Sequence, residues 1–379
     1  MTRPIQALVH SAALKHNLAR IKTLCASTQI LAVVKANAYG HGIERVYEGL
    51  RGADGFGVLE VGEAQRLRDL GWRGPILLLE GVFDPRELEE CSRLKLWHTV
   101  HCQAQIDWLT RHKTHEPHRV FLKMNSGMNR LGFSPESFKS AFTRLDACPQ
   151  VGEVSVMTHF SDADRVGGVQ TQLDVFLSHA SDLGGEISLC NSAAALLQPT
   201  RLGLRQDWVR LGIALYGGAV NAPEESAHSW GLQPTLTLRS EIIALQHVRA
   251  GQSVGYGSTF TAERDTRIGI VACGYADGYP RHAESGTPVL VQGLRTRTLG
   301  RVSMDMLAVD LECLFDTGQA QEAPIGMGSE VTLWGESSSG ARLEIDEVAH
   351  CAGTLSYELM CGLSTRVPIR LVDHDDAPA

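Results

Sequence analysis

Short apolar runs alternate with amphipathic stretches through about the first 215 residues. Each run has the length and the Val, Ile and Leu content of a buried parallel strand. The runs are ILAVVK (30–35), GFGVLE (55–60), PILLLE (75–80), KLWHTV (95–100), RVFLKM (119–124), EVSVMTH (153–159), EISLC (186–190) and DWVRL (207–211). Eight strands separated by helices predict an α/β fold, a (β/α)8 barrel, and an open doubly wound sheet is the competing arrangement.

The stretches between the runs place apolar side chains at helical spacing, as in SAALKHNLARIKTL, EAQRLRDLG and PRELEECSRL. SPESFKSAFTRL also begins with Ser134, a favourable N-cap residue, and has Pro135 at the first helical position. These stretches therefore predict the helices that connect the barrel strands.

The pattern changes after about residue 230. TLTLRSEIIALQHV, RIGIVACGY, PVLVQG, LAVDL, EVTLWG and VPIRLV predict short strands with glycine-rich turns, and EIDEVAHCAG is the only segment that predicts a helix. We expect a barrel over residues 1–230 and a mostly β domain over 231–373, with which the first few residues can pair. The acidic segment 374–379 predicts a disordered tail.

Composition excludes several classes of protein. The 379 residues carry a formal net charge of −8, which attracts neither nucleic acid nor an anionic membrane. No window approaches the roughly 18 apolar residues of a membrane span, and MTRPIQALVH lacks the apolar run of a secretory signal. The nine cysteines are scattered and form no CxxC pair, as expected of reduced thiols in a cytoplasm.

Candidate chemistry lies where the predicted strands end, because the functional groups of an α/β barrel gather there. Those ends carry Lys35, Glu60, Glu80, Val100, Lys123, His159, Asn191 and Arg210. Two lysines, a histidine and an arginine at one mouth require an anion, and a phosphate is the natural candidate. A lysine among other cations has a depressed pKa, and its neutral amine is a nucleophile.

The stretch VVKANAYGHG around Lys35 resembles the pyridoxal 5′-phosphate lysine signature of alanine racemases. Further stretches resemble the successive blocks of that family in the same order, from about residue 5 to residue 372. They are LKMNSGMNRLGF (122–133), MTHF (157–160), LCNSAA (189–194), VRLGIALYG (209–217), GYGSTF (255–260), GYADGYPR (274–281), GRVSMDM (300–306) and LSYEL (355–359).

The resemblance implies an isomerase that interconverts L-alanine and D-alanine with two bases, to supply or degrade a component of peptidoglycan. Lys35 would hold pyridoxal 5′-phosphate and act on one face of the substrate Cα. Tyr256 would act on the other face and would come from the partner subunit, so the active unit would be a homodimer with shared sites. The choice between a biosynthetic and a catabolic role stays open.

The resemblance also implies roles for other residues. Arg210 would face the pyridine nitrogen, which an arginine leaves unprotonated, and His159 would pack near the ring. The other cofactor contacts would be Tyr39, Asn191, Ser192, Gly212, Ile213 and Tyr357. The substrate contacts would be Arg130, Met304, Asp305 and Tyr275. Lys123 matches a lysine that many members carry in carbamylated form, and a carbamate would pin Arg130 instead of repelling it.

Other functions remain in view. A broader racemase would differ mainly in pocket volume, and a decarboxylase on the same cofactor would place an acidic residue where Arg210 stands. A non-catalytic cofactor carrier would lack the β domain and its Tyr256. A metal enzyme would need more ligands than Glu60, Glu80 and His159. His98 and His101 with Cys102, and the series His112, His115 and His118, could be metal ligands, but no four-ligand Cys/His set closes and no metal is expected. The series lies in a polar, proline-flanked stretch, where most histidines are solvated surface residues.

Overall fold

A computed structural model describes residues 3–25, 28–114, 116–165, 167–197, 206–220, 225–316 and 325–372. The chain forms two compact units. The barrel unit comprises residues 15–38 and 42–215, and the sheet unit comprises residues 1–14, 39–41 and 216–379. The predicted tail at 374–379 lies outside the described residues.

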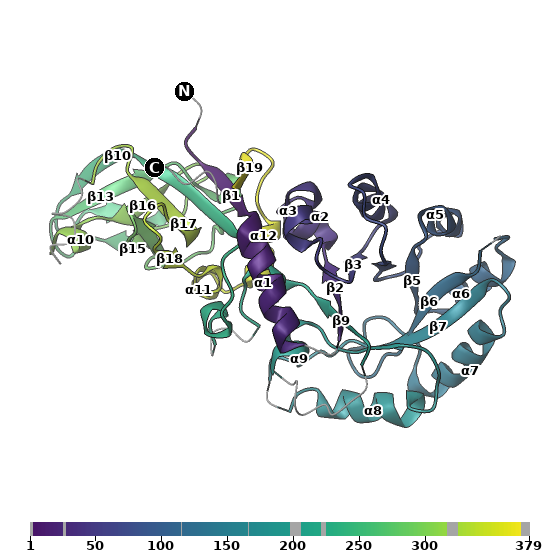
Figure 1. The fold of residues 1–379 in the computed structure, drawn as a ribbon. Helices are drawn as coiled ribbons and strands as arrows, with labels where there is room; N and C mark the ends of the chain where they lie inside the picture. The colour runs from purple at the N-terminus through teal and green to yellow at the C-terminus, as the bar shows by residue number, and fades with distance from the viewer. Residues whose placement is uncertain are drawn as a thin grey trace. The chain divides into compact units, whose positions relative to one another are not determined.

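The barrel unit is built on a closed ring of parallel strands, as Figure 1 shows in part. Neighbours pair in chain order, and the last strand pairs with the first at Leu31 and Arg210. The strands are β2 (Gln29–Val33), β3 (Gly55–Val58), β4 (Ile76–Leu78), β5 (Trp97–Val100), β6 (His118–Lys123), β7 (Val151–Met157), β8 (Ile187–Ser188) and β9 (Trp208–Leu211). The predicted (β/α)8 barrel is therefore confirmed, and the open sheet is excluded.

The interior of the barrel unit contains a cluster of large apolar side chains from different strands. It comprises Leu31, Leu77, Phe121, Met157 and Trp208, all at most 2% exposed. Parallel strands are covered on both faces, which explains their nearly continuous apolar sequences. These side chains fill the barrel interior, so the polar functional residues are expected at the ends of the strands.

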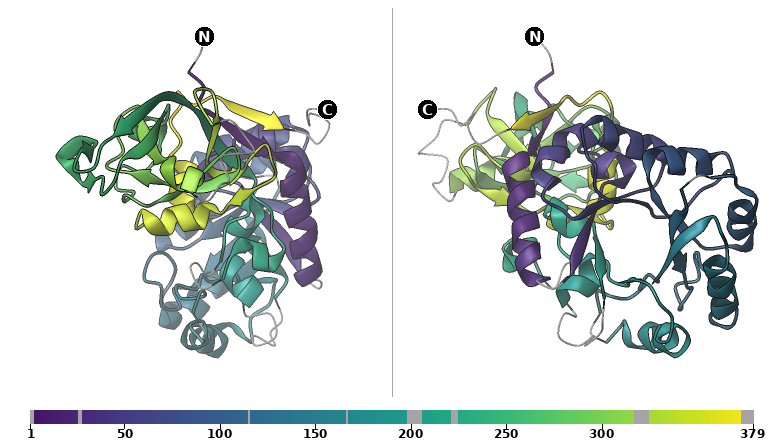
Figure 2. Two further views of the ribbon diagram at one scale, coloured as in Figure 1. Left: turned by 90° about the vertical axis from the view of Figure 1, so that its left-hand side faces the viewer. Right: turned by 45° about the vertical axis from the view of Figure 1, so that its right-hand side comes forward.

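Helices follow the strands on the outside of the ring, which the right-hand view of Figure 2 shows. Their apolar positions face inward, as with Leu88, Cys91 and Leu94 of α5. α7 begins at Pro135 after an extended Ser134, as predicted. The helices are α1 (Ser11–Leu24), α2 (Lys35–Tyr39), α3 (Ile43–Leu50), α4 (Val61–Asp69), α5 (Glu87–Leu94), α6 (Gln103–Arg111), α7 (Pro135–Asp146), α8 (Gln170–Ala180) and α9 (Ser192–Leu197).

The sheet unit contains a nine-stranded sheet in the order β18-β17-β14-β15-β16-β13-β10-β1-β19. β17 also pairs with β10, so the six strands β17-β14-β15-β16-β13-β10 form a closed ring. The strands are β1 (Gln6–His10), β10 (Leu236–Val248), β13 (Thr266–Val271), β14 (Pro288–Val291), β15 (Leu294–Leu299), β16 (Leu307–Asp310), β17 (Glu330–Glu336), β18 (Arg342–Leu343) and β19 (Ile369–Val372). A separate hairpin pairs β11 (Ser253–Val254) with β12 (Phe260–Thr261).

The expectation of a single helix after residue 230 was wrong. α11 (Ile345–Cys351) matches that prediction, but α10 (Glu312–Asp316) and α12 (Ser356–Cys361) are also helical. Both are shorter than two turns, so their sequences hold too few apolar positions to display helical periodicity.

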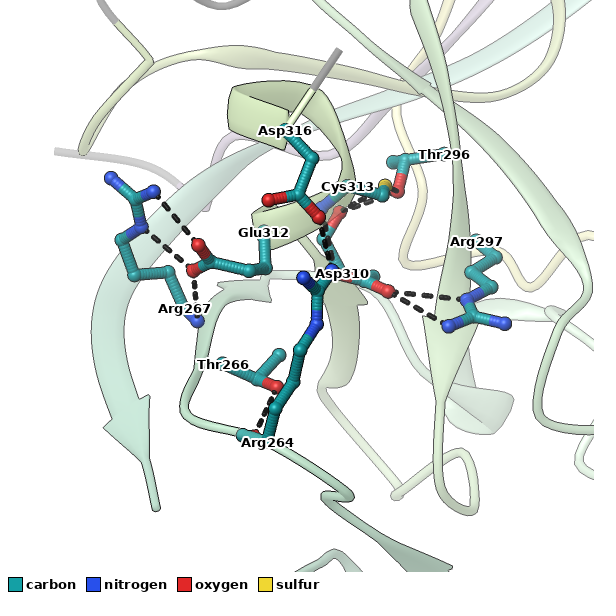
Figure 3. Close-up of polar contacts among 9 residues, drawn as sticks. All are labelled: Arg264, Thr266, Arg267, Thr296, Arg297, Asp310, Glu312, Cys313 and Asp316. Atoms are coloured by element: carbon teal, nitrogen blue, oxygen red, sulfur yellow. Dashed lines mark hydrogen bonds and ion pairs between the residues drawn. The ribbon is translucent and has the colours of Figure 1, made fainter. Parts of the chain in front are cut away.

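Ion pairs cross the strands of the sheet unit beside α10 (Figure 3). Arg267 donates to both carboxylate oxygens of Glu312. The Nε and Nη2 atoms of Arg297 both contact a single carboxylate oxygen of Asp310. The Arg267 guanidinium also lies 3.6 Å from the ring centre of Phe315. The Arg267 contacts attach α10 to β13, and the Arg297–Asp310 pair links β15 to β16.

None of the helices in the described ranges combines the length with the apolar character needed to cross a membrane.

Candidate active site

Lys35 lies two residues beyond the end of β2, at the start of a left-handed turn. Ala36, Asn37 and Ala38 have φ of 53°, 54° and 55° with ψ near the left-handed helical value. Tyr39 follows with φ of 51°, so four consecutive non-glycine residues have a positive φ, which costs roughly 1–2 kcal/mol each. Such strain persists only where surrounding contacts impose it, and it is common at functional sites.

Side chains of the barrel unit impose this turn. The backbone N–H of Asn37 donates to Glu63 at 3.1 Å, and the Asn37 side-chain oxygen accepts from Arg66 at 2.7 Å. A backbone bond of 2.8 Å from Ala38 to Val34 closes the turn. Lys35 is thereby held on a rigid support at a strand end.

Arg210 is the most constrained cation of the site and is only 5% exposed. Its Nη1 donates to the backbone oxygen and the hydroxyl of Ser188 at 2.9 and 2.7 Å, and its Nη2 donates to the Thr158 oxygen at 2.7 Å. Burial lowers the pKa of Arg210 to about 10, so the guanidinium stays charged at neutral pH. Its Nε–H makes no hydrogen bond within the described part of the chain and remains available to a ligand.

His159 accepts a hydrogen bond at Nδ1 from Arg210 Nη2 at 3.2 Å. Burial lowers the pKa of His159 to about 2, with further contributions from Arg210, Lys123, Arg130 and Lys35. The imidazole is therefore neutral, and since Nδ1 accepts, the proton resides on Nε2.

Lys123 ends β6 and is 6% exposed. Burial lowers its pKa to about 8, with contributions from Arg210 and Arg130. Lys123, Arg130 and His159 line one small pocket with the loop 124–131. The loop turns sharply at Gly132, where a Cβ would lie 2.5 Å from the Asn125 nitrogen, so only glycine fits.

Ser192 and Gly212 are joined by a hydrogen bond within the barrel unit. Ser192 begins α9 and is 4% exposed, and its hydroxyl accepts from the Gly212 N–H at 3.1 Å. Asn191 caps the helix because its side-chain oxygen accepts from the Ala194 N–H at 3.0 Å. Ile213 begins the 3-10 helix η1 (Ile213–Tyr216).

Tyr39 and Tyr357 belong to the sheet unit, where their ring centres are 5.8 Å apart. Tyr39 also stacks on Tyr216 at 4.6 Å, and burial raises its pKa well above the usual range, with Tyr357 and Cys361 adding to this. Tyr39 therefore keeps its phenolic proton and can donate it in a hydrogen bond.

The remaining predicted residues lie in the sheet unit as well. Tyr256 begins the 3-10 helix η3 (Tyr256–Ser258) and Tyr275 begins η4 (Tyr275–Asp277). Tyr256 is 70% exposed, Met304 53% and Tyr275 38%, which is unusual for side chains of this size. Asp305 follows Met304 and is bound by Arg366 at 2.7 Å.

The expectation of solvated histidines in the polar segment 112–118 was wrong for His118, which is buried beside His98. His98 and His118 are 1% and 4% exposed, with 3.3 Å between His98 Nε2 and His118 Nδ1. His115 lies outside the described residues. In the part of the chain that the structure does describe, no group of three or more His, Cys, Asp or Glu residues could hold a metal ion.

Comparison with known proteins shows where the chain belongs. The model of the alanine racemase N-terminal domain matches residues 9–220, and that of the C-terminal domain matches residues 235–371. The alanine racemase of Methylibium petroleiphilum is 64% identical to this chain, over 98% of this chain and 99% of the relative. That of Paracidovorax citrulli is 62% identical, over 97% of this chain and 99% of the relative. The chain belongs to the alanine racemase family.

Solved alanine racemase structures agree with this assignment. The biosynthetic alanine racemase from Pseudomonas aeruginosa superimposes with a TM-score of 0.90 at 43% identity, covering 98% of this chain and all of that one. The alanine racemase from Acinetobacter baumannii superimposes with a TM-score of 0.85 at 36% identity, with 98% of this chain covered. Both structural domains of the family are thus present.

Alanine racemases depend on pyridoxal 5′-phosphate, and the residues of the barrel unit fit that group. Lys35, Lys123, Arg130 and Arg210 lie near enough to one another to lower the pKa of His159 together. Such a cluster calls for an anion, and a phosphate supplies one. The Nε–H of Arg210 is a donor that would suit an acceptor such as a ring nitrogen.

Asp277 and Arg366, which were not predicted from the sequence, hold the segment containing Met304 and Asp305. Asp277 lies within GYADGYPR, but its partner is 89 positions away. Nothing in either local sequence signals that the two side chains meet.

Proposed function

We propose that this protein interconverts L-alanine and D-alanine as a pyridoxal 5′-phosphate-dependent racemase. The observation that carries the proposal is the site around Arg210, in a chain that belongs to the alanine racemase family over its whole length. The guanidinium is held by backbone oxygens, keeps its charge and offers one free N–H. A permanently protonated partner leaves the ring nitrogen unprotonated, which suits racemisation better than transamination.

The residues that would hold the cofactor in this proposal are Lys35, Tyr39, His159, Asn191, Ser192, Arg210, Gly212, Ile213 and Tyr357. When bound, pyridoxal 5′-phosphate takes up the substrate amine covalently and stabilises the negative charge that develops at Cα. The Ser192 hydroxyl and the phenolic proton of Tyr39 are donors suited to phosphate oxygens.

Racemisation requires one base on each face of the substrate Cα. Lys35 Nζ would hold the cofactor covalently, and once released it would take a proton from one face or return it there. The phenolic oxygen of Tyr256 would do the same on the opposite face. Arg130 would bind the substrate carboxylate, while Met304, Asp305 and Tyr275 would close the small pocket around the methyl group.

The exposed side chains of the sheet unit support a homodimer with shared sites. Tyr256, Tyr275, Met304 and Met306 are 70%, 38%, 53% and 44% exposed. Large apolar side chains exposed together mark an interaction surface. In this proposal the surface is covered by the second copy, so that Tyr256 of the partner subunit completes each site.

Lys123 would be carbamylated. Its pKa of about 8 leaves part of the amine neutral near neutral pH, and a neutral amine can add to carbon dioxide. The Nζ–C bond forms, one proton leaves to solvent, and the product is an anion. That anion would pair with Arg130, removing the repulsion between the buried Lys123 and the exposed Arg130.

Family membership also supports a cytoplasmic enzyme that supplies D-alanine for peptidoglycan or degrades it. This placement of the protein in the cell is part of the proposal.

Purified protein loaded with the cofactor tests the proposal. We expect racemisation of both alanine enantiomers, and borohydride reduction followed by peptide mapping to place the adduct on Lys35. Tyr256→Phe should lower kcat by about 100-fold or more, while exchange of the Cα hydrogen with deuterated solvent persists for one enantiomer. Tyr279→Phe is the matched control, because the Tyr279 hydroxyl is buried without a partner in the described part of the chain.

Equal losses in the two tyrosine variants, or an adduct on another lysine, would contradict this assignment. A protein that binds the cofactor on Lys35 without racemising alanine would be a carrier or a racemase of another amino acid.

A further inference from the structure

The carboxylate of Asp277 is fully buried in the sheet unit and binds two arginines. Its Oδ1 accepts from Arg3 Nη1 and from Arg366 Nε at 2.7 Å, and its Oδ2 accepts from the Gly274 N–H at 2.8 Å. Burial acts to raise the pKa of Asp277, but the two arginines and the N–H outweigh it and hold the pKa below its usual value. A charged carboxylate is therefore kept in place away from water.

Both arginines extend beyond Asp277 to the segment that contains Met304 and Asp305. Arg366 Nη2 donates to Asp305 Oδ1 at 2.7 Å and to the Met304 oxygen at 3.5 Å, and Arg3 Nη2 donates to the Asp305 oxygen. Two carboxylates and two guanidinium groups thus form one charge-neutral cluster. The planar guanidinium group can bridge two acceptors in this way, whereas an ammonium group is a single point of charge.

The backbone ties the same two turns together. The Tyr275 N–H donates to the Ser303 oxygen and the Ala276 N–H to the Met304 oxygen, both at 3.0 Å. A Cβ at Gly274 would lie 2.3 Å from the Ser303 oxygen, so only glycine allows this approach. Tyr275, Met304 and Asp305 are consequently held as one rigid group, which the ion pairs of Asp277 with Arg3 and Arg366 support.

We propose that Asp277, acting through Arg3 and Arg366, is a positioning residue that fixes and electrically neutralises the substrate-facing group Tyr275, Met304 and Asp305. The inference rests on the proposed function, which sets these three residues against alanine. An uncompensated Asp305 would repel the substrate carboxylate, and Arg366 prevents this by binding the Asp305 side chain. The cluster therefore controls substrate affinity and leaves the two bases untouched.

Arg366→Met removes the bridge between the two carboxylates and tests this role. We expect the KM for alanine and the inhibition constant of propionate, a carboxylate without an amine, to rise together by about tenfold, while kcat changes by less than about threefold. Added salt should recover part of the loss, because it screens the exposed Asp305. Arg366→Lys should restore part of the affinity, since one charge remains.

Arg342→Met is the matched control. Arg342 pairs with Glu336 at 2.7 Å elsewhere in the sheet unit and does not contact the Met304–Asp305 segment. Because both side chains of this pair are 37% exposed, the substitution should change stability little and should leave both constants unchanged. Arg3→Met provides a second test if Arg366→Met does not fold.

The outcomes separate the two proposals. A wild-type protein that does not racemise alanine would overturn the proposed function and this inference with it. An active wild type whose Arg366→Met and Arg3→Met variants keep KM within twofold, or lose kcat alone, would overturn the inference only.

Discussion

Arg66 donates a hydrogen bond of 2.7 Å from Nη2 to Oδ1 of Asn37, which lies in the left-handed turn after Lys35. Its Nε donates at 2.7 Å to Glu44, so the guanidinium itself is fixed. The Arg66 side chain, from helix α4, thus stabilises a left-handed backbone conformation that non-glycine residues usually avoid. The proposed catalytic Lys35 depends on that support.

Relief of this strain should stabilise the fold. Ala36 is exposed and has φ of 53°, so Ala36→Gly removes little packing while it removes the steric cost. We expect the free energy of unfolding to rise by about 0.5 kcal/mol, since the greater backbone entropy of glycine offsets part of the gain. Ala36→Val should lower it by about 1 kcal/mol or more, because a β-branched residue tolerates this region poorly. Urea unfolding measures both, and a loss of stability in Ala36→Gly would contradict the assignment of strain.

Acid should destabilise the protein through the buried histidines of the barrel unit. Burial lowers the pKa of His98 to about 3 and that of His118 to about 4, with neighbouring histidines contributing. Both bind protons more weakly in the folded state than in the unfolded state, whose pKa is about 6.5. Their contribution to stability is therefore complete above that value and is lost as the pH falls below it.

Between about pH 7 and pH 5 each histidine should account for a loss of about 2 kcal/mol in the free energy of unfolding. His98→Gln should remove the loss that His98 causes, so the free energy of unfolding of this variant should fall less steeply with acid than that of the wild type. Exposed His282 offers a matched control, and His282→Gln should follow the wild type. Parallel curves for all three proteins would show that His98 is not held neutral.

Carbamylation of Lys123 should be directly observable. Protein equilibrated with ¹³C-labelled bicarbonate is expected to show a carbamate carbon signal that disappears in Lys123→Met and after acidification. Lys139→Met, which removes an exposed lysine paired with Asp182, should keep the signal. Racemase activity of Lys123→Met should fall by about tenfold or more through loss of the Arg130 partner. A signal that survives in Lys123→Met would place the modification elsewhere.

The Arg267–Glu312 pair of Figure 3 should contribute to stability, mainly at neutral pH. The hydrogen bond from Arg267 lowers the pKa of Glu312 to about 2. Stability from this carboxylate is present above its unfolded value of about 4.5 and is lost as the pH falls toward 2. Because Arg267 is 45% exposed, solvent reduces the coupling to about 0.5–1 kcal/mol. A double-mutant cycle of Arg267→Met and Glu312→Gln measures it, and a coupling near zero at pH 7 would refute the prediction.

Local sequence was sufficient to predict the barrel. Each strand from β2 to β9 carries its own apolar run, and the helices between them carry their own apolar face, because strand and helix periodicities are properties of neighbouring residues. The family blocks also lie within short windows, which is why Lys35 and Tyr256 could be named in advance. The roles given to them remain predictions.

Contacts between distant segments were decided by the tertiary structure alone. Closure of the barrel brings His159 to Arg210, 51 positions apart, and the folding of the sheet unit brings Asp277 to Arg366. The burial of His98 and His118 arises in the same way. A single sequence records which residues a segment contains, whereas pKa values, ion pairs and backbone strain depend on what other segments place around it.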